Sequence, residues 1–261
     1  MSTGNLSLFY SAQMRIIRAE EHLKNLESQI NDFFAKAPYA YVAEPDPDGV
    51  HEIHKLKFTE RFPFKWRILA TEIIEHARAS LDHATFASHL AANGDPRSRY
   101  VAFPFGSKPS DLDNSIRGRS KDLIPEIQTL LRTFNCYDGG NDPLYILNEL
   151  SNVTKHALIQ LMAGIAFDFE IRGIGTEFPS EGVQFPKELK WDRTKNEIEY
   201  ARTKRGPHFQ HQANVKIFVA LEEKEVTHTV SAVAILNQML NAARNVIIAL
   251  EYECRRLGLK V

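Results

Sequence analysis

Two segments, one near each end of the chain, carry small or apolar residues at alternating steps of four and three. The first covers residues 6–36 and the second about 230–257. The repeating positions are Ala12, Ile16, Ala19, Leu23, Leu26, Ile30 and Phe33, then Val233, Leu236, Leu240, Ala243, Ile247, Leu250, Cys254 and Leu257. This spacing is the heptad repeat with which a helix packs along another helix. The sequence therefore predicts two long helices that pair with each other.

Two further long helices are expected between these ends. Residues 64–92 follow Pro63 and are apolar around most of the helix circumference, which is typical of a buried helix. The next helix is predicted to start with Asp142 as its N-cap and Pro143 as its first residue, and to run to about Met162. Between the two, residues 95–140 look rich in loops, with one short helix near "DLIPEIQTLLRTF".

Period-two alternation predicts two β regions. "YAYVAEPDPDGVHEIHKLKFTE" alternates on both sides of the turn signal "PDPDG" and is typical of a β-hairpin. Between Gly164 and Glu223 the predicted strands of an antiparallel sheet are "IAFDFEIRG", "ELKWD", "EIEYART" and "ANVKIFVAL".

The predicted fold class is α+β and mainly α, in a single domain over residues 1–261. We expect an antiparallel bundle of four long helices, formed by residues 1–163 and 228–261. A small antiparallel β-subdomain, residues 164–227, is inserted between the third and fourth helices, and the β-hairpin lies between the first and second.

Composition excludes several classes of function. The net charge of the 261 residues is −1, so no global basic field favours nucleic acid, although a local patch remains possible. The two cysteines, Cys136 and Cys254, form no C-x-x-C pair, which argues against a zinc ribbon or a redox dithiol. Charges interrupt every apolar run well before the ~18 residues of a membrane span, and no secretory signal pattern is present. We therefore expect a cytoplasmic protein with no membrane contact.

Polar residues recur on two of the predicted buried helices and need an explanation. One stripe lies in "LNELSNVTKHALIQL" and the other in the preceding long helix. The stripes comprise Asn148, Asn152, Lys155 and His156, and Glu75, Arg78 and Asp82. Steps of three and four place each set on one helix face, so two inward-facing stripes would form one site. The alternatives are a solvent-exposed face, and a buried Arg–Asp pair that fixes helix register.

Other chemistry has little support in the sequence. Glu72, His76 and His83 are spaced along one helix, but no H-E-x-x-H and no repeated E-x-x-H motif predicts a metal site. No nucleophile elbow, P-loop or G-x-G-x-x-G motif occurs, so no cofactor is expected. A basic segment could contact phosphate groups, or it could be an inert solvated turn. Its candidate substrate-binding residues are Arg202, Lys204, Arg205 and His208.

The two motif helices suggest a family. "ARASLDHATFA" and "LYILNELSNVTKHALI" resemble a group of uncharacterised bacterial proteins with an R-x-x-L-D-H helix followed by an N-x-x-K-H helix. That group is distantly similar to HEPN domains, helical bundles of toxins and antiphage nucleases with an R-x4-6-H motif. In the matching span "SNVTKH", Asn152 and His156 correspond to motif residues, whereas Ser151 stands in place of the arginine.

The resemblance implies a metal-independent ribonuclease, a toxin or an antiphage defence effector. His156 would act as acid or base, Lys155 or Arg78 would stabilise the phosphate charge, and Asn152 would orient the reacting groups. Asp82 corresponds to an acidic residue of the family. The resemblance also implies RNA as substrate, a homodimer, and an antitoxin or defence subunit as a protein partner. The alternative is a non-catalytic helical protein-binding or scaffold module, whose polar core only fixes helix register.

Overall fold

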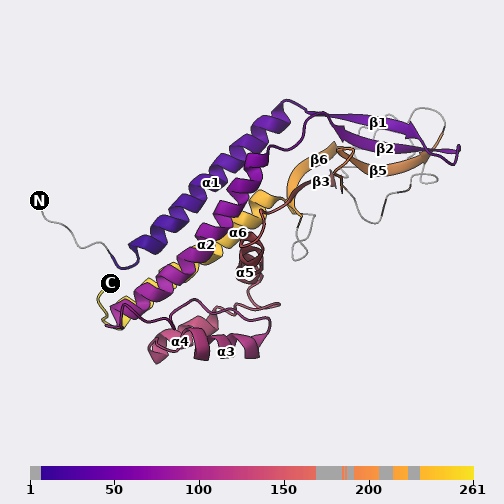
Figure 1. The fold of residues 1–261 in the computed structure, drawn as a ribbon. Coiled ribbons are helices and arrows are strands. Elements are labelled where there is room, and N and C mark those ends of the chain that lie inside the picture. The colour runs from indigo at the N-terminus through magenta and orange to yellow at the C-terminus, as the bar shows by residue number, and fades with distance from the viewer. Residues whose placement is uncertain (1–6, 169–183, 185, 187–190, 206–213, 223–229) are drawn as a thin grey trace, which may run out of the picture.

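The computed structural model describes residues 7–168, 184, 186, 191–205, 214–222 and 230–261. Within these residues the fold is α+β and mainly helical, with the long helices extending away from a β region at one end (Figure 1). The long helices are α1 (Tyr10–Ala35), α2 (Phe64–Ala91) and α6 (Ala232–Arg256).

The three long helices pack against one another, with α1 antiparallel to the other two. The ring of Phe33, near the end of α1, lies 5.2 Å from that of Trp66, near the start of α2. At the opposite end of α1, Gln13 Nε2 donates a 2.8 Å hydrogen bond to Glu251 Oε2 of α6. The predicted pairing of the terminal helices is confirmed, although α1 also packs along α2.

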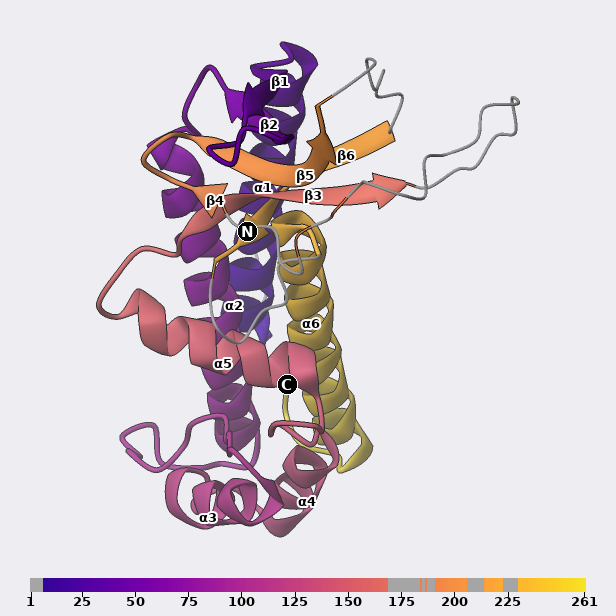
Figure 2. The ribbon, with the colours of Figure 1, turned by 90° about the vertical axis from the view of Figure 1, so that its right-hand side faces the viewer.

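A bundle of four long helices is not confirmed. The predicted third long helix is α5 (Asp142–Thr154), which has 13 residues, against 26 in α1. It packs on α2 and α6 and lies across them rather than along them (Figure 2).

The heptad positions form the core. All seven predicted positions of α1 are buried, and so are six of the eight in α6, from Leu236 to Cys254. A fully buried leucine or isoleucine side chain contributes about 1.5–3 kcal/mol. Helix α2 is also buried around most of its circumference, as its sequence predicts.

The predicted end of the third helix is wrong. Helix α5 ends at Thr154, and β3 (Leu161–Asp168) begins where the sequence predicts helix. Antiparallel pairing with β6 (Asn214–Leu221) explains the change, because Leu161 pairs with Leu221 and the ladder continues from there. Such pairing depends on residues far along the chain. The N-cap is Asn141, whose side chain accepts from the Leu144 amide, one residue earlier than expected.

The β-hairpin is confirmed as β1 (Tyr39–Pro45) and β2 (His51–Phe58). It belongs to a four-stranded antiparallel sheet with order β1-β2-β5-β4, in which β5 (Glu197–Lys204) and β4 (Trp191–Asp192) come from the insertion. The inserted strands therefore divide between this sheet and the β3–β6 pair, whereas the sequence analysis placed them in one sheet.

Two short helices cap the end of the long helices that lies away from the β region (Figure 1). Helix α4 (Pro125–Thr133) is the predicted short helix. Helix α3 (Pro109–Arg119) forms in the segment expected to be rich in loops.

One helix of the described chain, α6, is long and apolar enough to match a membrane span by length and composition. The sequence analysis expected no such segment. Helix α6 packs against α1, α2 and α5, and a core helix of a soluble protein meets the same criterion.

Candidate functional site

Two residues of the polar stripe of α2 form an ion pair within the helix. Arg78 Nη1 lies 2.7 Å from Asp82 Oδ2, one turn later. Asp82 Oδ1 accepts a 2.9 Å hydrogen bond from the backbone N–H of Phe103, and the guanidinium carbon of Arg78 lies 4.7 Å from the centre of the Phe105 ring. The pair thus fastens the segment after α2 to the helix. It has a structural role but differs from the buried register-fixing pair of the sequence analysis, because the Asp82 side chain is 40% exposed.

The three motif residues at the end of α5 lie together but face solvent. Asn152, Lys155 and His156 are all exposed, and Lys155 Nζ donates a 2.7 Å hydrogen bond to Asn152 Oδ1. His156 follows the last helical residue, Thr154. The expectation that this stripe faces inward is wrong, because α5 buries a different face. That face consists of Leu144, Leu147, Leu150 and Ser151.

The contacts of the described residues do not connect the two polar groups with each other. The segment after α5 meets α2 where Thr71 Oγ1 accepts from the Ile159 amide, at 3.1 Å. Asp82 lies eleven residues beyond Thr71, about 16 Å along the helix axis. Among the described residues, no hydrogen bond or ion pair joins Arg78 or Asp82 to the exposed group at the end of α5.

Arg202, a predicted phosphate contact, is bound to carboxylates of the β1–β2 turn. Its Nε lies 2.6 Å from Asp46 Oδ2, and its Nη2 lies 2.6 Å from Asp48 Oδ2. The hydrogen bond from the Val50 amide is the largest cause that holds the pKa of Asp48 below its ordinary range. Asp48 is therefore charged near neutral pH, and the charge of Arg202 is compensated inside the protein.

The other predicted phosphate contacts lie at or beyond the end of β5. Lys204 and Arg205 are exposed, and the Arg205 amide donates a 2.9 Å hydrogen bond to the Val50 carbonyl. His208 lies outside the described residues. The described part of the segment thus presents two exposed cations beside a hairpin turn.

His83, the last residue of the R-x-x-L-D-H motif, bonds to α1. Arg15 Nε donates to His83 Nε2 at 3.2 Å, and His83 Nδ1 lies 2.7 Å from Ser11 Oγ. A guanidinium can only donate, so Nε2 accepts and Nδ1 carries the proton. Burial, and then the charge of Arg15, lower the pKa of His83 and keep the ring neutral. A base-activated serine donates to its histidine, whereas Ser11 accepts, so the trio is not arranged for nucleophilic attack.

Two more histidines lie between α1 and α2. The rings of His22 and His76 stack at 5.7 Å, and His22 Nδ1 lies 3.6 Å from Glu72 Oε2. Burial is the largest cause that lowers the pKa of His76. In the described ranges no group of three or more His, Cys, Asp or Glu residues is placed to hold a metal ion.

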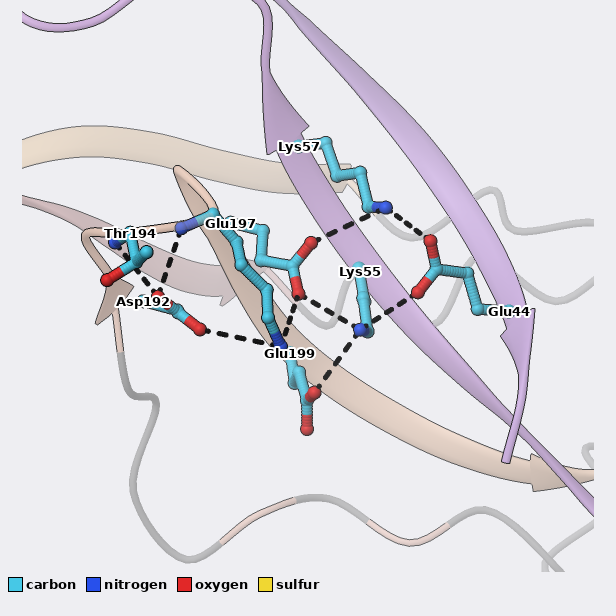
Figure 3. A network of polar contacts seen from close by, with 8 residues as sticks. Glu44, Lys55, Lys57, Asp192, Thr194, Glu197 and Glu199 are labelled. Atoms are coloured by element: carbon cyan, nitrogen blue, oxygen red, sulfur yellow. Dashed lines mark hydrogen bonds and ion pairs between the residues drawn. The ribbon is translucent and has the colours of Figure 1, made fainter. Parts of the chain in front are cut away.

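An ion cluster around the buried Lys55 and Glu197 of the four-stranded sheet was not predicted from the sequence (Figure 3). Lys55 Nζ lies 2.9 Å from Glu44 Oε2, 3.0 Å from Glu197 Oε1 and 3.5 Å from Glu199 Oε1. Lys57 bridges Glu44 and Glu197 beside it. The signal that could have revealed the cluster is the complementary alternation of Lys-Leu-Lys in β2 and Glu-Ile-Glu in β5, which face each other across the sheet.

Each charged group in this cluster stabilises the charged form of its partners. Burial acts to lower the pKa of Lys55, but its hydrogen bonds to Glu44 and Glu197 outweigh burial and raise it. Hydrogen bonds from Lys57 and then Lys55 lower the pKa of Glu44 to about 2. Each ionic group therefore already has a partner, and the cluster has the character of a structural connection between strands.

Neither cysteine is suited to nucleophilic chemistry. Both are buried, and burial raises the pKa of Cys136 to about 12 and that of Cys254 above its ordinary value. The thiolate is the reactive form, so both remain inert thiols near neutral pH.

No family model matches the chain, and neither curated proteins nor solved structures give a significant match. The HEPN-like resemblance thus stays a prediction that depends on the motif residues. The placement of those residues is the evidence from which a function can be argued.

Proposed function

We propose that this chain is a non-catalytic helical module that binds protein. The observation that carries the proposal is a set of three contacts. Arg78 pairs with Asp82, Asp82 accepts a hydrogen bond from the Phe103 amide, and the Arg78 guanidinium lies over the Phe105 ring. These residues were the predicted cation and carboxylate of an active centre, and they pair with each other and contact the chain after α2.

Catalysis would demand a different arrangement. Metal-independent RNA cleavage needs an acid or base and a cation within hydrogen-bond reach of one phosphate. His156 is exposed beyond α5, and Arg78 is bound in the middle of α2. Arg202 already has two carboxylate partners. A scaffold whose polar residues fix its own elements accounts for each of these contacts.

The outer face of α1 supplies a surface for a partner. Tyr10, Met14 and Ile17 are 41–44% exposed and lie at steps of four and three, opposite the buried heptad. This spacing suits an added helix, and the partner we propose is a second copy of the chain. Antiparallel pairing about Met14 would place Tyr10 of each copy against Ile17 of the other, in a self-complementary contact.

Analytical ultracentrifugation over a concentration series tests this partner. We expect the wild-type chain to form a dimer and Met14→Glu to remain a monomer, because a buried unpaired carboxylate opposes association. Ser28→Glu is the matched control, since Ser28 is exposed two heptads further along the same outer face of α1. A wild-type chain that stays monomeric throughout the series, or equal dissociation constants for both variants, would exclude this surface.

A ribonuclease is the second candidate, and one observation favours it. Asn152, Lys155 and His156 stay adjacent and exposed at the end of α5, where a phosphodiester could reach them. In this case Lys155 would stabilise the phosphate charge and His156 would transfer the proton, with Arg78 and Asp82 serving structure only.

One comparison separates the two candidates. The wild-type chain and His156→Ala are incubated with mixed RNA in the presence of a chelator, and each is also expressed in a bacterium. We expect intact RNA and equal growth for both proteins. Cleavage and toxicity that disappear with His156→Ala would replace the module with a metal-independent ribonuclease.

The cytoplasm is the proposed setting. Cys136 and Cys254 are free thiols in the described structure, as is usual in a reducing compartment. The buried face of α6 packs against α1, α2 and α5, as in a core helix of a soluble protein, so the proposal includes no membrane span.

A further inference from the structure

The outer face of α6 carries two of the most exposed large apolar side chains in the described chain. Tyr252 is 68% exposed and Ile248, one turn earlier, is 57% exposed. Helix α1, which packs against α6, exposes its own apolar strip of Tyr10, Met14 and Ile17. Contiguous apolar side chains on a protein surface mark interaction sites. The relative position of the two groups therefore decides whether they form one surface.

Two polar contacts fix how α6 lies beside α1. Gln13 Nε2 donates a 2.8 Å hydrogen bond to Glu251 Oε2, and Glu20 forms an ion pair with Arg244. The second contact lies seven residues further along α1 and seven residues back along α6. Both contacts thus describe one antiparallel alignment of the two helices.

This alignment places the two apolar groups at the same height. One residue on from the Gln13 hydrogen bond, Met14 lies level with Leu250, which is midway between Ile248 and Tyr252. The centre of the exposed strip of α1 is therefore level with the centre of the exposed pair of α6.

The apolar surface continues from α1 toward α6 and not toward α2. On the α2 edge of α1, Arg15 Nε bonds to His83 Nε2, so that edge is polar. On the α6 edge, the neighbouring cation Arg255 is paired with Glu251 at 2.7 Å. The charge beside the apolar pair is thus compensated within the chain.

A second copy of the chain needs more surface than α1 alone provides. A stable contact between proteins buries about 800 Å² on each partner. The strip of α1 has only three apolar side chains, each less than half exposed. We infer that α6 forms the second half of the contact between two copies, with Ile248 of each copy packed against Tyr252 of the other. This inference rests on the proposed pairing of two copies through α1.

One two-fold axis satisfies both helices. An axis at the level of Met14 places Tyr10 of each copy against Ile17 of the other, as proposed above. Because the exposed pair of α6 is centred at the same level, that axis also places Ile248 of each copy against Tyr252 of the other. Such a contact is self-complementary, as two-fold symmetry requires. Helix α1 then packs on α1 and α6 on α6, in a seam of four helices.

Analytical ultracentrifugation of the full chain tests the contribution of α6. Ile248→Glu should raise the dissociation constant of the dimer by about tenfold or more, because a carboxylate would be buried without a partner. Gln238→Glu is the matched control, since Gln238 is exposed on α6 ten residues before Ile248 and lies away from the apolar pair. Circular dichroism should show the same helix content for both variants.

A mixing experiment tests the register across the axis. Tyr252→Lys should weaken the dimer by itself, as Ile248→Glu does. In an equal mixture of these two variants, the new carboxylate of one copy faces the new ammonium group of the other, and the second contact keeps the wild-type pair. We therefore expect the mixture to form a heterodimer that is tighter than the dimer of either variant alone.

The outcomes distinguish this inference from the proposed function. A wild-type dimer that dissociates with Met14→Glu but not with Ile248→Glu overturns the α6 half and leaves the α1 contact in place. If Ile248→Glu and Tyr252→Lys each weaken the dimer but their mixture associates no better, the register about the axis is wrong. A wild-type chain that stays monomeric excludes the α1 contact and the α6 contact together.

Discussion

The helical region and the four-stranded sheet both bury apolar side chains, but the sheet also buries a pair of opposite charges. Between α1, α2 and α6 most buried side chains are apolar, such as Leu26, Leu81 and Leu240. Buried hydroxyl groups of α2, such as those of Ser80 and Thr85, donate hydrogen bonds to backbone carbonyls of the same helix. In the sheet, the side chains of Lys55 and Glu197 are 8% and 4% exposed. Apolar burial needs no particular partner, whereas a buried charge needs its counter-charge in place. The helical region should therefore tolerate change that the sheet does not.

The largest expected effect comes from removing the central cation of the sheet. Lys55→Met leaves Glu197 buried beside Glu44 without its closest cation, and we expect a loss of about 3–5 kcal/mol in the free energy of unfolding. Urea unfolding followed by circular dichroism measures this loss. A loss no larger than that of a surface substitution would mean that water or another cation compensates Glu197.

Three comparison variants sharpen that result. Lys57→Met removes a cation of the same cluster that is 36% exposed, so its effect should be much smaller. Lys55→Met combined with Glu197→Leu removes both buried charges and should recover most of the lost stability. In the helical region, the fully buried Ile74→Val should cost only about 0.5–1.5 kcal/mol.

The same contrast explains how far the sequence alone could predict the fold. The positions from Ala12 to Phe33 repeat within one helix, so their burial follows from local spacing. The end of α5 depends on β6, about sixty residues later, and no local signal at Thr154 announces that pairing. The order of the sheet was equally inaccessible, because it required knowing that β2 pairs with β5.

The candidate site shows a similar division. Spacing of four correctly placed Arg78 and Asp82 within reach of each other, and their mutual pairing was one of the predicted alternatives. Their contacts with the Phe103 amide and the Phe105 ring depend on how the following segment returns to α2. For Asn152, the error concerned which face α5 buries, and for His156 it came from extending the helix beyond Thr154.

The smallest expected effect separates the two regions by pH. The pKa of Glu44 is lowered from 4.5 to about 2 by its hydrogen bonds to Lys57 and Lys55. A lowered folded value means that Glu44 contributes stability that is complete above pH 4.5 and is lost as the pH falls from 4.5 toward 2. Apolar contacts between α1, α2 and α6 do not titrate, so this loss should begin in the sheet.

Two tryptophans can report on that difference. Both rings contact Phe62, but Trp191 in β4 also packs on Phe58 of the sheet, and Trp66 in α2 also packs on Phe33 of α1. In single-tryptophan variants, we expect the urea midpoint reported by Trp191 to fall more steeply below pH 4.5 than that reported by Trp66. Glu44→Gln should flatten the Trp191 profile in this range and leave the Trp66 profile almost unchanged. Coincident profiles at every pH would contradict this expectation, because they would show that the sheet and the helices unfold as one cooperative unit.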